Sequence, residues 1–215
     1  MGIWRVIWTG CLGMCCLVPM AWISFQFLDL TSAVSNGIFI DLGPALNTIL
    51  TTFLPGALGS VASFLGGALM GIVMILFFPL HWALYYRPGD IPMALAIIVP
   101  WILTGTITSA LFCKKAKQGF DTGLAVGLGY GIGITIPVLL LDGFLSGRFG
   151  LSIIGVFNGL FTGLTDLPFY LALFTSCIEG GLIGGIFGAF IGSLKYKPGE
   201  EGETGKKAKK PKRIK

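Results

Sequence analysis

The sequence predicts an all-α protein, a polytopic bundle of transmembrane helices. Of its 215 residues, 54% are hydrophobic and only 12% are charged, and the mean hydropathy is +0.84. Soluble domains carry about a quarter charged residues, so this composition excludes a water-soluble fold. A spanning helix needs roughly 20 apolar residues. Residues 1–194 therefore form one transmembrane domain with room for six or seven crossings and no separate soluble domain.

Five apolar runs are long enough to cross a membrane at about 1.5 Å of rise per residue. They are residues 3–28, 57–86, 92–113, 122–141 and 168–194. The first is longer than the apolar core of a signal peptide and contains Pro19 and three Trp, so we interpret it as a retained helix. The second ends with Trp82, Tyr85 and Tyr86, which are typical of an interfacial aromatic belt.

Two shorter runs leave the topology open. Residues 37–54 are either a marginal span or a re-entrant segment, and residues 149–164 either dip into the membrane or cross it. Positive residues in short loops stay mostly cytoplasmic. Arg5, the loop from Lys114 to Lys117 and the C-terminal tail all lie on the cytoplasmic side if residues 37–54 cross the membrane and residues 149–164 do not. We therefore predict six crossings of the cell membrane with both termini cytoplasmic. Seven crossings would put the termini on opposite sides.

The last 21 residues, 195–215, differ from the rest of the chain. They hold nine of the fifteen Lys and Arg, so the net charge of +5 belongs to this tail. The tail is rich in Gly, Pro, Glu and Lys without apolar periodicity, which predicts disorder. Its lysines predict contact with anionic lipid at the membrane surface. No aromatic residue follows Tyr196 to stack on bases, so we do not expect nucleic-acid binding.

A faint internal similarity relates residues 36–86 to residues 158–194. Asn36-Gly37-Ile38-Phe39 is echoed by Asn158-Gly159-Leu160-Phe161, and a Leu-Pro pair and a Gly-Gly pair follow each of them. Duplicated halves are common in membrane transport proteins. The spacing inside the two copies differs, and Gly-rich apolar sequence produces chance matches easily. A true repeat and a coincidence therefore stay alternatives.

Small residues at a spacing of four form ridges on four of the predicted helices. This spacing places them on one helix face, where missing side chains let a second backbone approach closely. The ridges are Gly59, Ser63, Gly67 and Gly71; Gly123, Gly127 and Gly131; Gly155, Gly159 and Gly163; and Gly180, Gly184, Gly188 and Gly192. We expect them to pack the protein's own bundle. The alternative is that the last ridge faces a second copy, as a homo-oligomer, or a membrane partner subunit.

Ionisable residues inside apolar runs are costly in the hydrocarbon layer and are functional candidates by default. Glu179 lies near the middle of its run, whereas Asp41 and Asp166 lie closer to the ends of theirs. These three residues are the candidate ion or proton site. For Glu179 the alternative is a neutral carboxyl that hydrogen-bonds across a helix pair, for instance to Thr or Ser. His81, beside Trp82, is more typical of a belt residue than of a ligand.

Enzymatic chemistry has little support, and we expect no enzyme. Asp142 and Asp166 suggest an intramembrane aspartyl protease, but Gly163-Leu164-Thr165-Asp166 departs from the Gly-x-Gly-Asp pattern of that class. Pro44-Ala45-Leu46 precedes both aspartates, whereas the family places this element after them. No metalloprotease His-Glu pair, P-loop or dinucleotide fingerprint occurs. The five cysteines include no C-x-x-C pair, so we expect neither a metal nor a cofactor.

Two functions remain. The first is a small transporter, channel or substrate-binding membrane subunit, favoured by Glu179, by helix-breaking Pro and Gly, and by the internal similarity. The second is a non-catalytic scaffold or accessory subunit, favoured by the glycine ridges and the absence of large loops. We favour transport. It predicts that Glu179 lies near Asp166, Asp41, Asn158 or freed helix carbonyls around a cavity, whereas a scaffold predicts a filled bundle.

Overall fold

The computed structural model describes residues 3–27, 71–86 and 88–195, and all of its secondary structure in these ranges is helical. The helices are α1 (Ile3–Phe27), α5 (Leu80–Tyr86), α6 (Ile91–Phe112), α7 (Ala116–Phe149), α8 (Ile153–Thr165) and α9 (Phe169–Leu194). Residues 71–77 are helical as well. Four helices, α1, α6, α7 and α9, are long and apolar enough to cross a membrane. The all-α class is confirmed, and the count of six crossings stays a prediction.

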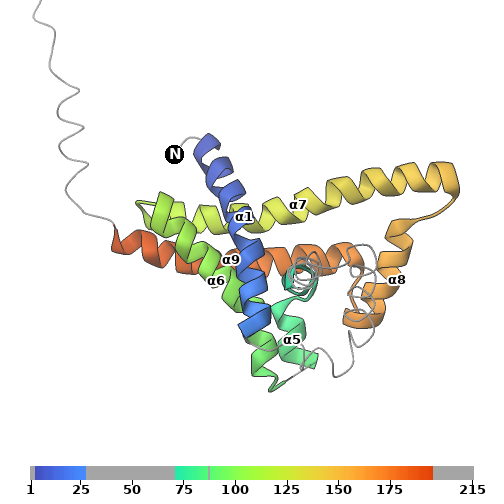
Figure 1. Ribbon diagram of the computed structural model, residues 1–215, viewed down its shortest axis with the longest axis horizontal. Helices are drawn as coiled ribbons and strands as arrows, with labels where there is room; N and C mark the ends of the chain where they lie inside the picture. The colour runs from blue at the N-terminus through green and yellow to red at the C-terminus, as the bar shows by residue number, and fades with distance from the viewer. Residues whose placement is uncertain (1–2, 28–70, 87, 196–215) are drawn as a thin grey trace, which may run out of the picture.

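Helix α9 lies at the centre of the bundle and packs against both α7 and α6. Figure 1 shows α7 and α9 running side by side, with α1 crossing them. Each of the four long helices contributes a buried side chain to one cluster: Leu17 from α1, Trp101 from α6, Val126 from α7 and Leu173 from α9. The hydrophobic core therefore sits where side chains of these four helices meet.

Helices α7 and α8 differ from the predicted runs. The run 122–141 is part of a helix of 34 residues, about 51 Å long. Asp142 and the residues after it lower the hydropathy but continue the helix, which ends where Gly150 adopts a left-handed conformation with φ 68°. The following α8 has only 13 residues, about 20 Å, so it is too short to cross a bilayer of about 30 Å alone.

The predicted span 57–86 is not one helix in its described part. Residues 71–77 and α5 are separated at Phe78 and Pro79, and Figure 1 shows the two pieces running in different directions. Proline removes a backbone donor and clashes with the preceding turn, which explains the break. Phe78 and Trp82 pack edge to face and are both buried, so Trp82 belongs to the core and not to an exposed belt.

Proline acts differently in the other helices. Pro19, Pro100 and Pro137 lie inside α1, α6 and α7 without ending them.

Of the two repeat copies, 36–86 lies mostly outside the described residues, so the internal duplication stays a prediction.

One end of the bundle collects basic residues, and we call it the basic end. It contains Arg5, Lys114, Lys115, Lys117 and Lys195. Arg5 donates to the Phe112 carbonyl oxygen at 2.6 Å, and Lys195 donates to the Ala110 carbonyl oxygen. Both cations thus contact the last carbonyls of α6, where the helix dipole favours positive charge.

The basic end constrains the topology. Helix α1 begins there and α6 ends there, while Ser24 near the end of α1 donates to the Ala96 carbonyl near the start of α6. The two helices are therefore antiparallel, so the end of α1 and the start of α6 both lie at the end of the bundle opposite the basic end.

Glycines join α9 to its two neighbours along most of its length. A Cβ atom added at Gly123 or Gly127 of α7 would overlap the α9 backbone, and one added at Gly184 would lie 2.9 Å from the Trp101 carbonyl oxygen of α6. The other α9 glycines with contacts this close are Gly180, Gly188 and Gly192. We call the contact that these glycines make between α9 and its two neighbours the α9 glycine seam. It consists of Gly123 and Gly127 of α7 and of Gly180, Gly184, Gly188 and Gly192 of α9. Backbone or side-chain atoms of the facing segments already touch the helix backbone at these positions, so they have no room for a side chain.

The other predicted ridges are placed differently. Gly131 packs on the Phe174 ring, and an added Cβ at Gly71 would lie 2.8 Å from the Ala21 carbonyl oxygen. On α8, an added Cβ would meet no atom of another described helix within 4 Å. The α8 glycines are Gly155, Gly159 and Gly163. The ridge of Gly59, Ser63 and Gly67 lies outside the described residues.

We expect Gly123→Ala to destabilise the bundle and Gly133→Ala, on the same helix, to leave it unchanged or slightly more stable. Alanine favours a helix over glycine by up to about 1 kcal/mol at either position. At Gly123 the new methyl group overlaps the backbone of Gly185, and overpacking costs about 1–3 kcal/mol. At Gly133 the new methyl group would lie 3.8 Å from Met14 Cε, an ordinary van der Waals contact. Thermal unfolding in detergent measures the difference, and equal melting temperatures would contradict the seam.

Candidate functional site

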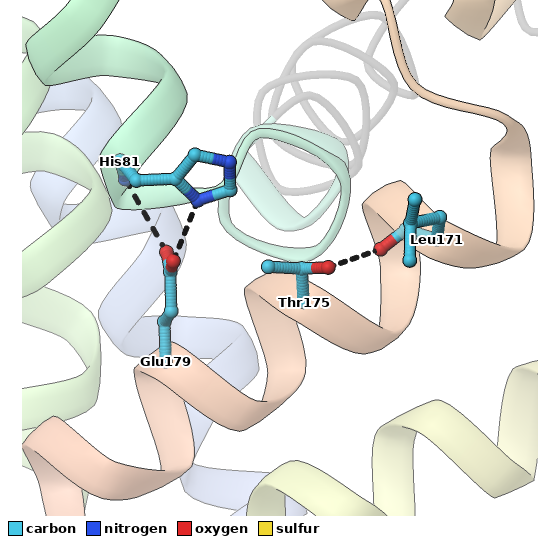
Figure 2. Close-up of polar contacts among 4 residues, drawn as sticks. All are labelled: His81, Leu171, Thr175 and Glu179. Carbon is cyan, nitrogen blue, oxygen red and sulfur yellow. Dashed lines mark hydrogen bonds and ion pairs between the residues drawn. The ribbon is translucent and has the colours of Figure 1, made fainter.

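Glu179 of α9 pairs with His81, the only histidine of the chain. Glu179 Oε1 lies 2.6 Å from His81 Nδ1, and Glu179 Oε2 accepts from the His81 backbone N–H at 3.4 Å. Figure 2 shows both contacts, with the carboxylate rising from α9 toward the start of α5. The Glu179 side chain is 27% exposed and the His81 side chain 53% exposed. The pair therefore lies at the rim of the bundle and not in its core.

The break before α5 creates this site. The first N–H groups of any helix lack a partner within the helix, and His81 lies in the first turn of α5. The Glu179 carboxylate accepts from this N–H. The hydroxyl of Thr175, one turn earlier on α9, donates instead to the Leu171 carbonyl of its own helix at 2.6 Å, as Figure 2 also shows. The partner of Glu179 is thus His81 and not a Thr or Ser, and His81 is more than a belt residue.

A carboxyl group and an imidazole this close form a hydrogen bond in which either group can be the donor. Nδ1 either donates to the carboxylate or accepts from the carboxyl group, depending on where the proton sits. Histidine is the side chain whose charge changes most readily near neutral pH. His81 is the more exposed partner of the pair, so the hydrogen bond links a group at the outer edge of the bundle to a side chain of α9.

Asp166 does not join this pair. It ends α8 in a left-handed conformation with φ 56°, and its N–H bonds to the Thr162 carbonyl at 3.1 Å. Its side chain forms a hydrogen bond with Tyr86 at the far end of α5. The two predicted acids therefore hold opposite ends of α5 rather than one common site. Asp41 lies outside the described residues.

Other polar side chains in the apolar runs cap helices. Asn158 of α8 accepts from the Phe169 N–H at the start of α9 at 3.0 Å. Asp142 of α7 accepts from the Ile154 N–H at the start of α8, also at 3.0 Å. Such caps typically contribute about 1 kcal/mol each. Asn158 is thus bonded to the start of α9, and Asp142 to the start of α8.

Sequence reasoning missed these cross-helix caps and the role of His81. The local caps carried a signal: Asp90 precedes Ile91-Pro92 and accepts from the Met93 N–H of α6, and Ser152 accepts from the Gly155 N–H of α8. An aspartate followed by proline at the first helical positions is a recognisable start.

Among the described residues, no group of three or more His, Cys, Asp or Glu side chains is placed to hold a metal ion. Comparisons of the chain with protein-family models, with curated proteins and with solved structures give no match. The geometry of the site itself must therefore carry any functional assignment.

We expect Glu179→Ala to destabilise the protein by roughly 0.5–1.5 kcal/mol, the net contribution of a hydrogen bond, because the partly exposed His81 N–H and imidazole lose their acceptor. Glu179→Gln should cost clearly less, since the amide oxygen still accepts from the backbone. Thermal unfolding of the two variants gives the comparison, with Thr175→Val as a control whose hydroxyl bonds only its own helix. If Glu179→Ala and Glu179→Gln lower the melting temperature equally, the hydrogen bond from the His81 N–H to Glu179 does not stabilise this region.

Proposed function

We propose that this chain is a small multi-pass transport protein of the cell membrane, either a transporter, a channel or a substrate-binding membrane subunit. In this proposal it is not an enzyme, and Glu179 with His81 is its proton-exchange site. The observation that carries the proposal is the pairing itself: a carboxylate within the apolar helix α9 meets the only histidine of the chain at a helix break.

The position of Glu179 supports this function. It is the eleventh of the 26 residues of α9, so it lies at the depth of the hydrocarbon layer if α9 spans the membrane. An ionisable group at that depth is costly and is retained mainly where it serves a proton or ion pathway. Helices broken near such a group recur in transporters, where freed backbone groups line the binding site. The break at Pro79 places a freed N–H on this carboxylate.

A scaffold or accessory subunit is the second candidate, and two observations favour it. The α9 glycine seam fills the contact of α9 with α6 and α7 without leaving space between backbones. Asp142 and Asn158, which otherwise resemble candidate site residues, both cap helices. In this alternative, Glu179 is a further cap and exchanges no proton.

Proton flux separates the two candidates. The protein is reconstituted into vesicles that contain a pH-sensitive dye, and a potassium diffusion potential is applied. The internal pH of vesicles with the wild-type protein should change faster than that of vesicles with Glu179→Gln. Glutamine keeps an acceptor for the His81 N–H but cannot exchange a proton. We expect His81→Gln to lose the flux as well.

Asp142→Asn is the matched control for this experiment. It makes the same acid-to-amide change at a residue that caps α8, and it should retain the wild-type flux. A Glu179→Gln protein that conducts as fast as the wild type at potentials of both signs would leave only the scaffold function.

The basic end supports a topology for this transport protein. We propose that it faces the cytoplasm, because short positive loops are retained on that side. Both termini then lie inside, and the basic tail 195–215 contacts anionic lipid of the inner leaflet. The described part of the chain supports the shared side of Arg5, the Lys114 to Lys117 loop and Lys195 through the contacts of Arg5 and Lys195 with α6.

Cysteine labelling tests this topology. The five native cysteines are first replaced, and single cysteines are introduced by Pro88→Cys before α6 and Gly199→Cys in the tail. We expect an impermeant maleimide to label position 88 on intact cells and position 199 only after permeabilisation. Position 88 is used for labelling, and Asp90 is kept, because the Asp90 side chain caps α6. Labelling of position 199 on intact cells would reverse the orientation.

A further inference from the structure

A groove with a volume of about 620 Å³ runs between the first turns of α1 and the first turns of α7, at the basic end. Val6 and Ile7 form its α1 wall. Its α7 wall changes from polar to apolar along the helix. The polar part is Lys115, Lys117, Gln118 and Asp121, and the apolar part includes Leu124 and Leu128. None of these residues belongs to the site of Glu179 and His81.

The change along α7 matches the cross-section of a membrane. Thirteen residues separate Lys115 from Leu128, about 20 Å along a helix. Lys115 immediately precedes the first turn of α7, so it lies at headgroup depth when α7 spans the membrane, and Leu128 lies alongside the acyl chains. Ile7 and Leu128 are 48% and 46% exposed. The apolar wall is therefore open to the lipid phase and not closed inside the bundle.

The charge of the groove selects an anion at its outer end. Lys115 and Lys117 are exposed and outnumber Asp121, which lies one turn deeper than Lys117. The Gln118 oxygen accepts from the Lys114 N–H at 2.9 Å, so its NH₂ group is the part that can donate to a ligand. Asp121 opposes an anion that enters more deeply, and the negative group of a ligand is thus held at the level of the two lysines.

We propose that this groove binds one anionic phospholipid of the surrounding bilayer. The phosphate-bearing headgroup contacts Lys115, Lys117 and the Gln118 amide, and the first part of an acyl chain lies against Ile7, Leu124 and Leu128. Basic pockets between transmembrane helices are typical sites for acidic headgroups. Free phosphate satisfies only the polar end of the groove, whereas a phospholipid satisfies both ends. This site is independent of the proposed transport function.

Native mass spectrometry of the delipidated full-length protein tests the proposal, with phosphatidylglycerol and phosphatidylcholine of identical acyl chains as probes. The wild type should bind one phosphatidylglycerol in preference to phosphatidylcholine. Each lysine near a lipid surface contributes about fivefold in affinity. The double variant Lys115→Gln with Lys117→Gln should therefore bind phosphatidylglycerol at least about tenfold more weakly and lose the preference.

Two further variants make the test specific. Lys206→Gln with Lys207→Gln removes the same charge from the tail, whose sequence carries no apolar run, and should reduce the preference clearly less than the Lys115 and Lys117 variant does. Leu128→Trp narrows the groove at its apolar wall without changing the charge, and it should weaken the binding of both lipids. The proposal is overturned if the Lys115 and Lys117 variant binds as the wild type does, if the tail variant loses the preference equally, or if excess inorganic phosphate displaces the lipid completely.

Discussion

Close contact between the backbone of α9 and those of α6 and α7 is the constraint on which the rest of the structure depends. Lipid chains solvate apolar side chains as well as protein does, so helices in a membrane associate through close van der Waals packing. Gly123 and Gly127 of α7 and Gly184 of α9 allow backbone to meet backbone or carbonyl at such distances. The Trp101 ring lies against Gly180, where a side chain of any other residue would displace it.

This contact also sets the rotation of α9 about its own axis and thereby the direction of Glu179. With Gly180 against α6 and Gly181 against α7, the preceding residue is directed toward the break before α5, where the His81 N–H needs an acceptor. The polar chemistry of the chain follows the same logic elsewhere. A polar side chain is placed where a helix start on another segment leaves an N–H without a partner, as with Asn158 and Phe169.

Much of this arrangement was predictable from local pattern, and the part that was not depends on distant residues. Hydropathy places α6 and α9 to within about two residues, because both helices begin beside proline and end where charge begins. Spacing by four aligns glycines on one helix face, but packing decides which of these faces is covered: the α9 glycines meet α6 and α7, whereas the α8 glycines meet no other described helix. The partner of Glu179 was not predictable, since His81 lies 98 residues away and no local rule relates them. The extra turns of α7 were missed because an apolar window stops at Asp142.

The length of α7 makes the protein responsive to bilayer thickness. A helix of about 51 Å exceeds a hydrocarbon layer of about 30 Å, so it must incline steeply or carry its last turns out of the layer. Asp142 lies in those turns and holds the first turn of α8, and α8 in turn holds the start of α9 through Asn158. Hydrophobic mismatch at one helix is thus transmitted through two capping bonds to the helix that bears Glu179. The length of the lipid acyl chains thereby affects how α7, α8 and α9 are placed relative to one another.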